Sequence, residues 1–136
     1  MDIAKLRQKL ITQGLSRADL STDAIKQFKI WFELVEKTAI YNHNVMILSS
    51  ADKKADSRTV LLKGIDNGFI FFTNYTSKKA QQIATNPQVA LSFPWWLIER
   101  QVHILGNASK IDKQASKKSS DRLKKMVPCP YEQSSI

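Results

Sequence analysis

The sequence has only one cysteine in 136 residues and contains no long apolar run. A single cysteine excludes an internal disulfide and any metal site built from several cysteines. No segment approaches the roughly 20 consecutive apolar residues that a membrane-spanning helix needs. The first residues also lack the apolar core of a secretory signal peptide. These absences predict one globular domain over residues 1–136, located in the cytoplasm and with a modest hydrophobic core.

Signatures of several catalytic classes are also missing. There is no Walker loop and no Gly-x-Gly-x-x-Gly turn for binding nucleotide phosphates. The two histidines, His43 and His103, lie at no spacing typical of metal ligands, so we expect no metal site. No serine or cysteine has a base at the spacing of a nucleophile motif. Any difficult redox chemistry therefore depends on a bound cofactor.

Acidic residues are scarce relative to basic ones. The chain has 12 Asp and Glu against 21 Lys and Arg, which gives a net charge of +9. A strongly basic protein attracts anionic ligands and partners. The charge alone does not distinguish a nucleic acid, an anionic lipid surface and a phosphorylated small molecule, so these alternatives stay open at this point.

The spacing of apolar residues predicts a helical segment over residues 1–41. Leu6 and Leu10 form a weak apolar stripe that ends at Gly14. A second helix is predicted after the possible N-cap residues at 19–22, because apolar residues between Ile25 and Val35 recur at helical spacing. We interpret the aromatic residues of this second stripe as core rather than as a cofactor site.

Short apolar segments bounded by turn residues predict β-strands over residues 45–105. Asp66-Asn67-Gly68 is a strong hairpin signal, because Asn and Gly tolerate positive φ. A short helix is predicted from Ser77 to Thr85, and a further one from Lys113 to Lys125. The fold class expected from this order is mainly β with α: a small antiparallel β-barrel with peripheral helices. Residues 106–136 are expected to form an incomplete C-terminal helix and tail.

The segment Ser77-Lys78-Lys79 is the most informative local feature. Ser77 is typical of an N-cap, which places both lysines in the first helical turn. Cations are mildly unfavourable at that end of a helix unless an anion binds there. Free backbone N–H groups, a hydroxyl and two ammonium groups can together bind a phosphate. The alternative is that both lysines are simply solvated, and the pattern alone does not choose.

Other candidates are individually weaker. Arg58 and Lys63 lie at the two ends of an apolar strand. The alternative to a binding role is that both side chains are simply exposed to solvent there. Trp95 and Trp96 can stack on a planar ring or close the end of a barrel. Gln101 can hydrogen-bond the edge of a heterocycle, because its amide both donates and accepts.

These features belong to an ordered series of short motifs. The series is Arg58-Thr59-Val60-Leu61-Leu62-Lys63, Phe72-Thr73-Asn74, Ser77-Lys78-Lys79, Asn86-Pro87, Phe93-Pro94-Trp95 and Glu99-Arg100-Gln101-Val102. In this order the motifs resemble the pyridoxamine 5'-phosphate oxidase family, over about residues 6–105. The resemblance implies a split barrel that binds FMN at a homodimer interface. It also implies oxidation of pyridoxamine or pyridoxine 5'-phosphate to pyridoxal 5'-phosphate, with molecular oxygen reduced to hydrogen peroxide.

The resemblance also assigns roles to individual residues, with Arg58 near the FMN phosphate. The positions that match FMN contacts are Arg58, Thr59, Val60, Leu61, Leu62, Phe72, Thr73, Lys78, Lys79, Gln101, Gln133 and Ser134. The positions that match substrate contacts are Lys63, Arg7 and Arg122. The resemblance identifies no catalytic residue in this chain.

Some expected features of the family are missing. Leu10 stands where the family has a tyrosine, and the segment 126–131 reads as a damaged version of the family sequence. The family's Trp-Gly-Gly and Arg-x-His motifs do not occur, which suggests a C-terminally truncated member with weak or absent turnover. The alternatives are a non-catalytic module for FMN or another planar anion, a basic nucleic-acid-binding protein that stacks bases on Trp95 and Trp96, and a frameshifted gene product.

Overall fold

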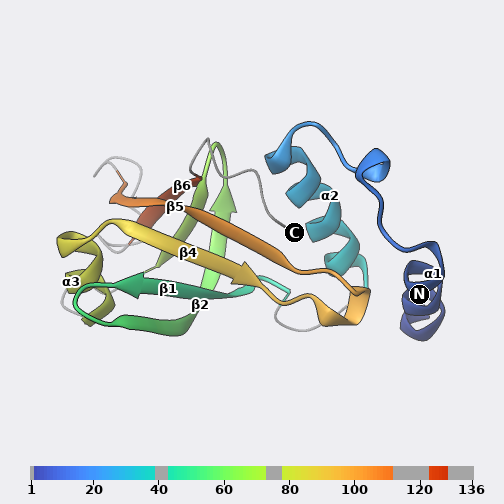
Figure 1. Ribbon diagram of the computed structural model, residues 1–136, viewed down its shortest axis with the longest axis horizontal. Coiled ribbons are helices and arrows are strands. Elements are labelled where there is room, and N and C mark those ends of the chain that lie inside the picture. Colours follow the sequence, from blue (N-terminus) through green and yellow to red (C-terminus); the bar gives the residue numbers. More distant parts are fainter. Residues whose placement is uncertain (1, 39–42, 73–77, 112–122, 129–136) are drawn as a thin grey trace. The chain divides into compact units, whose positions relative to one another are not determined.

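The computed structural model describes residues 2–38, 43–72, 78–111 and 123–128 (Figure 1). They belong to two compact units, which we describe separately. The helical unit comprises Met1–His43 with Pro94–Val102, and the barrel unit comprises Asn44–Phe93 with His103–Ile136. The expectation of a single FMN-binding domain over residues 1–136 stays a prediction.

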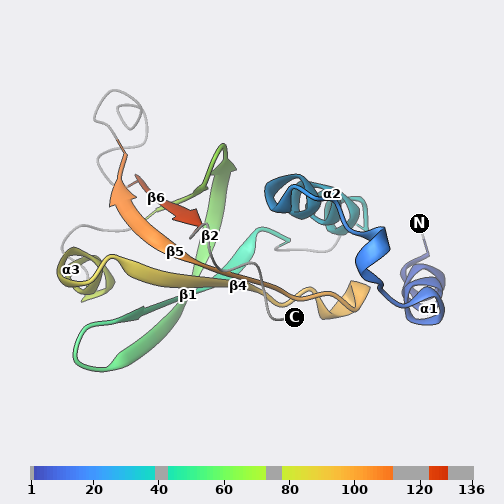
Figure 2. The same cartoon turned by 45° about the horizontal axis from the view of Figure 1, so that its top comes forward.

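The barrel unit contains a closed antiparallel barrel (Figure 2). Its elements are β1 (Val45–Ala51), β2 (Ala55–Ile65), β3 (Phe69–Phe72), α3 (Lys78–Thr85), β4 (Gln88–Phe93), β5 (Val102–Lys110) and β6 (Leu123–Pro128). Around the barrel the strands follow the order β1-β2-β3-β6-β5-β4. The small antiparallel barrel predicted from the sequence is therefore confirmed.

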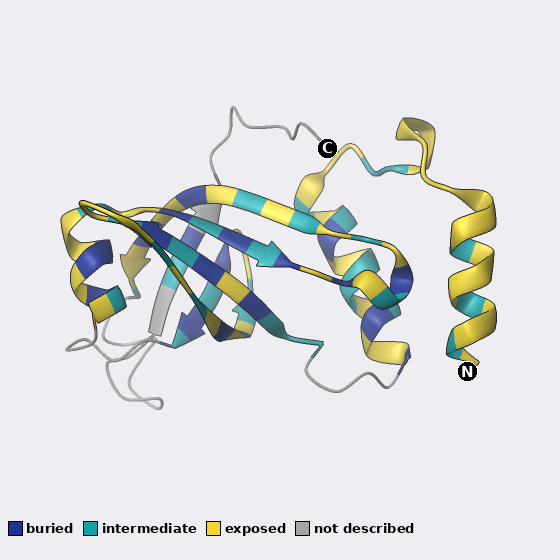
Figure 3. Cartoon of the chain, turned by 60° about the horizontal axis from the view of Figure 1, so that its bottom comes forward, coloured by how far each residue is buried: buried dark blue, intermediate teal, exposed yellow. Residues whose placement is uncertain are grey.

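The barrel interior is filled by alternate residues of its strands. Met46 and Leu48 of β1 have no exposed surface, whereas Ile47 between them is 36% exposed. On β2, Val60 and Leu62 are buried while Leu61 is 42% exposed. Successive strand residues point to opposite faces, and Figure 3 shows this as alternating buried and exposed colours along the strands.

The predicted hairpin at Asp66–Gly68 joins β2 to β3, but for a different reason than expected. Its backbone closes through a hydrogen bond from Asp66 N–H to the Gly68 carbonyl at 3.1 Å. Among the described residues, positive φ occurs at Gly14 and Glu99, not in this turn. Glycine is required at position 68 because a Cβ there would lie 2.5 Å from the carbonyl oxygen of Met126. Close approach of β6 therefore selects Gly68.

Strand β6 corrects the prediction for the C-terminal part. A helix was expected to reach Lys125, whereas residues 123–128 form a strand, and residues 112–122 lie outside the described residues. In this strand Met126 pairs with Phe69 of β3 and with Ala108 of β5. Strand β6 forms hydrogen bonds with the free edges of both β3 and β5. Because these partners are far away in the sequence, the local pattern of residues does not predict the pairing. The barrel strands also continue to Lys110, beyond the predicted limit at residue 105.

The helical unit contains α1 (Ile3–Gln13), η1 (Arg17–Asp19), α2 (Ala24–Lys37) and η2 (Trp96–Ile98). The N-cap of α2 is Asp23, one residue beyond the predicted segment, and its carboxylate accepts hydrogen bonds from the N–H groups of Ile25 and Lys26. Helix α1 ends at Gly14, as predicted, where φ is 63°. Among the helices of the described residues, none is long and apolar enough to cross a membrane.

Aromatic side chains form the core of the helical unit. Phe28 of α2 is 3% exposed, and its ring centroid lies 5.3 Å from that of Trp95. Phe32 lies 6.1 Å from Trp95 in an edge-on arrangement. The Trp95 indole N–H donates to the carbonyl of His43 at 3.3 Å. The interpretation of the stripe as core is confirmed for Phe28, whereas Phe32 and Trp31 are only half-buried. Buried Trp95 is not available to stack on a base.

Candidate functional site

A polar cluster lies where β1, β2 and α3 meet in the barrel unit. Its centre is Arg58, whose side chain is 20% exposed. Arg58 Nη1 donates to Ser50 Oγ at 2.8 Å and to the Leu48 carbonyl at 3.2 Å, and Nη2 donates to Gln82 Oε1 at 2.8 Å. We call the five residues Ser50, Asp56, Arg58, Lys78 and Gln82 the Arg58 cluster.

The strand pattern explains why these polar side chains meet. Arg58 belongs to the same face of β2 as buried Val60 and Leu62, and Ser50 belongs to the same face of β1 as buried Met46 and Leu48. The register pairs Ser50 with Asp56 across the two strands. The inward-facing rows therefore change from apolar to polar at this end of the barrel.

The Arg58 cluster contains one acid and two bases. Asp56 Oδ2 lies 3.5 Å from Arg58 Nη2 and 3.4 Å from Lys78 Nζ. The Ser57 N–H and, after it, the side chains of Gln82 and Lys78 hold the pKa of the Asp56 carboxyl below its usual value. Asp56 is therefore charged at neutral pH, and the cluster keeps one positive charge in excess. An excess cation in a partly enclosed polar site favours an anionic ligand.

Helix α3 adds its positive end to this site. It begins at Lys78, so Lys78 and Lys79 lie in the first turn, as the sequence predicted. The Lys78 side chain is 79% exposed, and Lys79 is half-buried. The backbone N–H groups of the first turn and the helix dipole both favour negative charge here. Ser77, the predicted N-cap, lies outside the described residues.

The predicted β2 motif divides between the two faces of the strand. Thr59, Leu61 and Lys63 are exposed on the outer face, whereas the side chains of Val60 and Leu62 are 8% and 5% exposed inside the barrel. Lys63 Nζ lies 4.8 Å from the centroid of the Phe72 ring. Direct contacts of Val60 or Leu62 with a ligand outside the barrel must therefore come from their backbone groups.

The remaining predicted site residues are distributed elsewhere. Gln101 and Arg7 belong to the helical unit, where Gln101 is exposed and Arg7 Nη2 forms an ion pair with Glu99 Oε1 at 2.6 Å. Thr73, Arg122, Gln133 and Ser134 lie outside the described residues. Sequence reasoning did not select Ser50, Asp56 or Gln82. The change from apolar to polar residues along the inward rows is the signal that could have found the first two.

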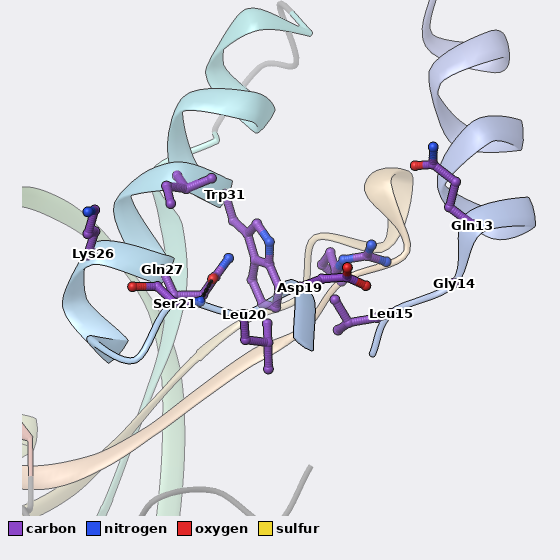
Figure 4. Close-up of a pocket in the computed structure, with 11 residues that line it drawn as sticks. Gln13, Gly14, Leu15, Asp19, Leu20, Ser21, Lys26, Gln27 and Trp31 are labelled. Carbon is purple, nitrogen blue, oxygen red and sulfur yellow. Dashed lines mark hydrogen bonds between the residues drawn. The ribbon is translucent and has the colours of Figure 1, made fainter. Parts of the chain in front are cut away.

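An open hollow of about 810 Å³ occurs in the helical unit (Figure 4). Its walls include Asp19, Trp31 and Arg100, with the Arg100 guanidinium carbon 5.7 Å from the Trp31 ring centroid. Hydrogen bonds from Ser16 hold the pKa of the Asp19 carboxyl below its usual value. None of the predicted site residues lines this hollow. Within the described part of the chain, no three His, Cys, Asp or Glu side chains are grouped to hold a metal ion.

Comparison with known proteins decides the family. The sequence model of the pyridoxamine 5'-phosphate oxidase family matches residues 32–135. The chain belongs to this family. It is 51% identical over 114 residues to a pyridoxine/pyridoxamine 5'-phosphate oxidase of Rippkaea orientalis, covering 82% of this chain and 54% of the relative. It is 47% identical over 114 residues to the corresponding oxidase of Crocosphaera subtropica, covering 82% and 53%. The chain thus spans about half the length of these relatives.

Solved structures show the same split-barrel fold at low sequence identity. PhzG from Burkholderia lata matches with a TM-score of 0.72 and 22% identity, over 78% of this chain and 55% of that one. A pyridoxamine 5'-phosphate oxidase-related, FMN binding protein from Nostoc punctiforme matches with a TM-score of 0.59 and 17% identity, over 74% and 56%. The split barrel expected from the family resemblance is therefore confirmed.

Proposed function

We propose that this chain binds FMN and that the Arg58 cluster holds its phosphate. The observation that supports the proposal most directly is the half-buried guanidinium of Arg58 beside the first turn of α3, in a cluster with one excess positive charge. A phosphate dianion suits such a site, because arginine and lysine donate charge-assisted hydrogen bonds to it. Family membership supports the same choice of ligand.

The described residues of β2 and β3 fit the rest of the cofactor. Exposed Thr59 and Leu61 offer polar and apolar surface on the outer face of β2, and half-buried Phe72 of β3 offers apolar surface next to Lys63. We propose that these residues, Lys79 and the β2 backbone line the flavin, and that Gln101, Thr73, Gln133 and Ser134 complete its contacts. When bound, FMN supplies the two-electron redox chemistry for which no described side chain is suited.

The reaction proposed for the protein is the oxidation of pyridoxine or pyridoxamine 5'-phosphate to pyridoxal 5'-phosphate. For the alcohol substrate, the carbon loses one hydrogen with two electrons, as a hydride equivalent, and the hydroxyl loses a proton as the C=O bond forms. Molecular oxygen takes up the two electrons and two protons and becomes hydrogen peroxide. Lys63, Arg7 and Arg122 are the proposed substrate contacts, because each can donate to a phosphate or a pyridine hydroxyl. We also propose that the protein is a homodimer located in the cytoplasm, and both of these proposals rest on family membership alone.

Binding and turnover need separate experiments, because the chain spans about half the length of its relatives. Titrating the full chain with FMN and with riboflavin, which lacks the phosphate, measures binding through flavin fluorescence. We expect Arg58→Met to weaken FMN by roughly tenfold or more with little change for riboflavin. Arg17→Met, at an exposed arginine of the helical unit, is the matched control.

Three results bear on the proposal. No preference of the wild-type chain for FMN over riboflavin would contradict a phosphate site. FMN binding without hydrogen peroxide release from pyridoxine 5'-phosphate would favour the non-catalytic FMN-binding module. Release of hydrogen peroxide in proportion to bound FMN would support the oxidase.

A further inference from the structure

Gln82 connects every other member of the Arg58 cluster except Lys78. Its Oε1 accepts hydrogen bonds from Arg58 Nη2 at 2.8 Å and from Ser50 Oγ at 2.7 Å. Its Nε2 donates to Asp56 Oδ2 at 3.4 Å. The residue is 7% exposed, so its amide is almost fully removed from water. A single side chain of α3 therefore joins β1 and β2 through polar contacts.

The chemistry of its neighbours fixes which way the Gln82 amide faces. Arginine can only donate hydrogen bonds and an ionised aspartate can only accept them. The amide oxygen must therefore face Arg58 and the amide nitrogen must face Asp56, as the contacts show. Among the described residues, every buried side-chain nitrogen and oxygen has a hydrogen-bond partner. A satisfied buried network of this kind holds its members in one arrangement.

The network leaves Arg58 little freedom. Nη1 is held on one side by Ser50 Oγ and the Leu48 carbonyl, and Nη2 is held on the other by Gln82 Oε1. Without the contact to Gln82, the end of the guanidinium that carries Nη2 has only the longer contact to Asp56 at 3.5 Å. An arginine fixed before the ligand arrives loses less side-chain entropy when the ligand binds.

Three donors converge on one oxygen in this cluster. Arg58 Nη2, Lys78 Nζ and Gln82 Nε2 lie 3.5, 3.4 and 3.4 Å from Asp56 Oδ2. These distances are long for charge-assisted hydrogen bonds, which are usually about 2.7–2.9 Å. The Asp56 carboxylate thus shows where an anionic oxygen lies with respect to the fixed guanidinium, without a short charge-assisted hydrogen bond to it.

We infer that Gln82 is a positioning residue that holds the Arg58 guanidinium in the orientation that receives the FMN phosphate. This inference rests on the proposed FMN site and goes beyond it, because Gln82 acts through Arg58. Its effect should therefore depend on the phosphate of the ligand and be absent for a flavin that lacks one.

The test replaces Gln82 by methionine, which keeps the length of the side chain but neither accepts from Arg58 nor donates to Asp56. We expect Gln82→Met to weaken FMN binding roughly tenfold and riboflavin binding less than about twofold. Flavin fluorescence titration of the full chain measures both affinities. Gln81→Met is the matched control, since it makes the same change at the exposed neighbouring position of α3. We expect it to change neither affinity.

The outcomes separate this inference from a purely structural role and from the proposed function. If Gln82→Met lowers the affinities for FMN and riboflavin by the same factor, the ratio of the two affinities is unchanged. That result would overturn the inference while leaving the FMN site in place. A wild-type chain without preference for FMN would overturn both. If Gln82→Met does not fold, Ser50→Ala decides, because it removes the opposite support of Arg58 and should lower the FMN-to-riboflavin ratio about threefold.

Discussion

Replacing Gly68 by alanine tests how the barrel closes. A Cβ at this position would lie 2.5 Å from the Met126 carbonyl oxygen and 3.1 Å from Lys125 Cε. The lysine carbon can move, but the carbonyl belongs to β6, where Met126 pairs with Phe69. Relief of the clash therefore requires a shift of strand backbone. We expect Gly68→Ala to lower the free energy of unfolding by about 1–3 kcal/mol, the range for overpacking a close-packed interior.

Gly64 provides a matched control in β2, on the other side of the same turn. A Cβ there would meet Ile70 Cδ1 at 3.7 Å, an ordinary van der Waals contact. Gly64→Ala should therefore be neutral or stabilise by up to about 1 kcal/mol, because alanine restricts the unfolded chain. Urea unfolding followed by far-ultraviolet circular dichroism, which includes the barrel strands in its signal, measures both variants. Equal stability of the two would mean that β6 does not approach Gly68 as closely as described.

The remaining predictions concern charge and packing. Asp56→Asn should strengthen FMN binding about two- to fivefold at low salt, because it removes the carboxylate that faces Arg58 and Lys78. An equal increase of riboflavin affinity in the same titration would contradict this prediction. Met126→Ala should lower the free energy of unfolding by about 2–5 kcal/mol, because this β6 side chain has no exposed surface; a loss below about 1 kcal/mol in urea would speak against its burial. Lys125 holds the pKa of the Asp66 carboxyl below its usual value. Their contact should therefore stabilise the fold above the ordinary aspartate pKa and be lost on acidification, so Lys125→Met should flatten the acid limb of a stability–pH curve.

The sequence predicted local elements better than distant pairings. Helix α3 and the hairpin at Asp66–Gly68 follow from residues next to one another, and both were located correctly. Strand β6 was missed, because its identity depends on pairing with β3 and β5 rather than on its own pattern. The role of Gly68 was misjudged for the same reason, since the carbonyl that excludes a Cβ belongs to a residue far along the chain.

The candidate site shows the same limit. Arg58, Lys78 and Lys79 could be selected from the sequence because their charge and position in the motif are local facts. Gln82 could not, because it reaches Arg58 across 24 residues only after α3 packs against the barrel. Ser50 joins through the register that places it opposite Asp56. Partners that orient a binding residue are set by tertiary packing, and no spacing rule identifies them.

The two faces of β2 give the residues of the motif Arg58-Thr59-Val60-Leu61-Leu62-Lys63 two separate physical roles. Val60 and Leu62 are buried in the barrel, so substitutions there act first on packing and stability. Thr59, Leu61 and Lys63 face outward, so substitutions there leave the core intact and act on whatever binds the outer face. A loss of flavin affinity after a change at Val60 or Leu62 is therefore no evidence of ligand contact. The same loss at Thr59 or Leu61 in a chain of unchanged stability is such evidence, because no core contact has been removed.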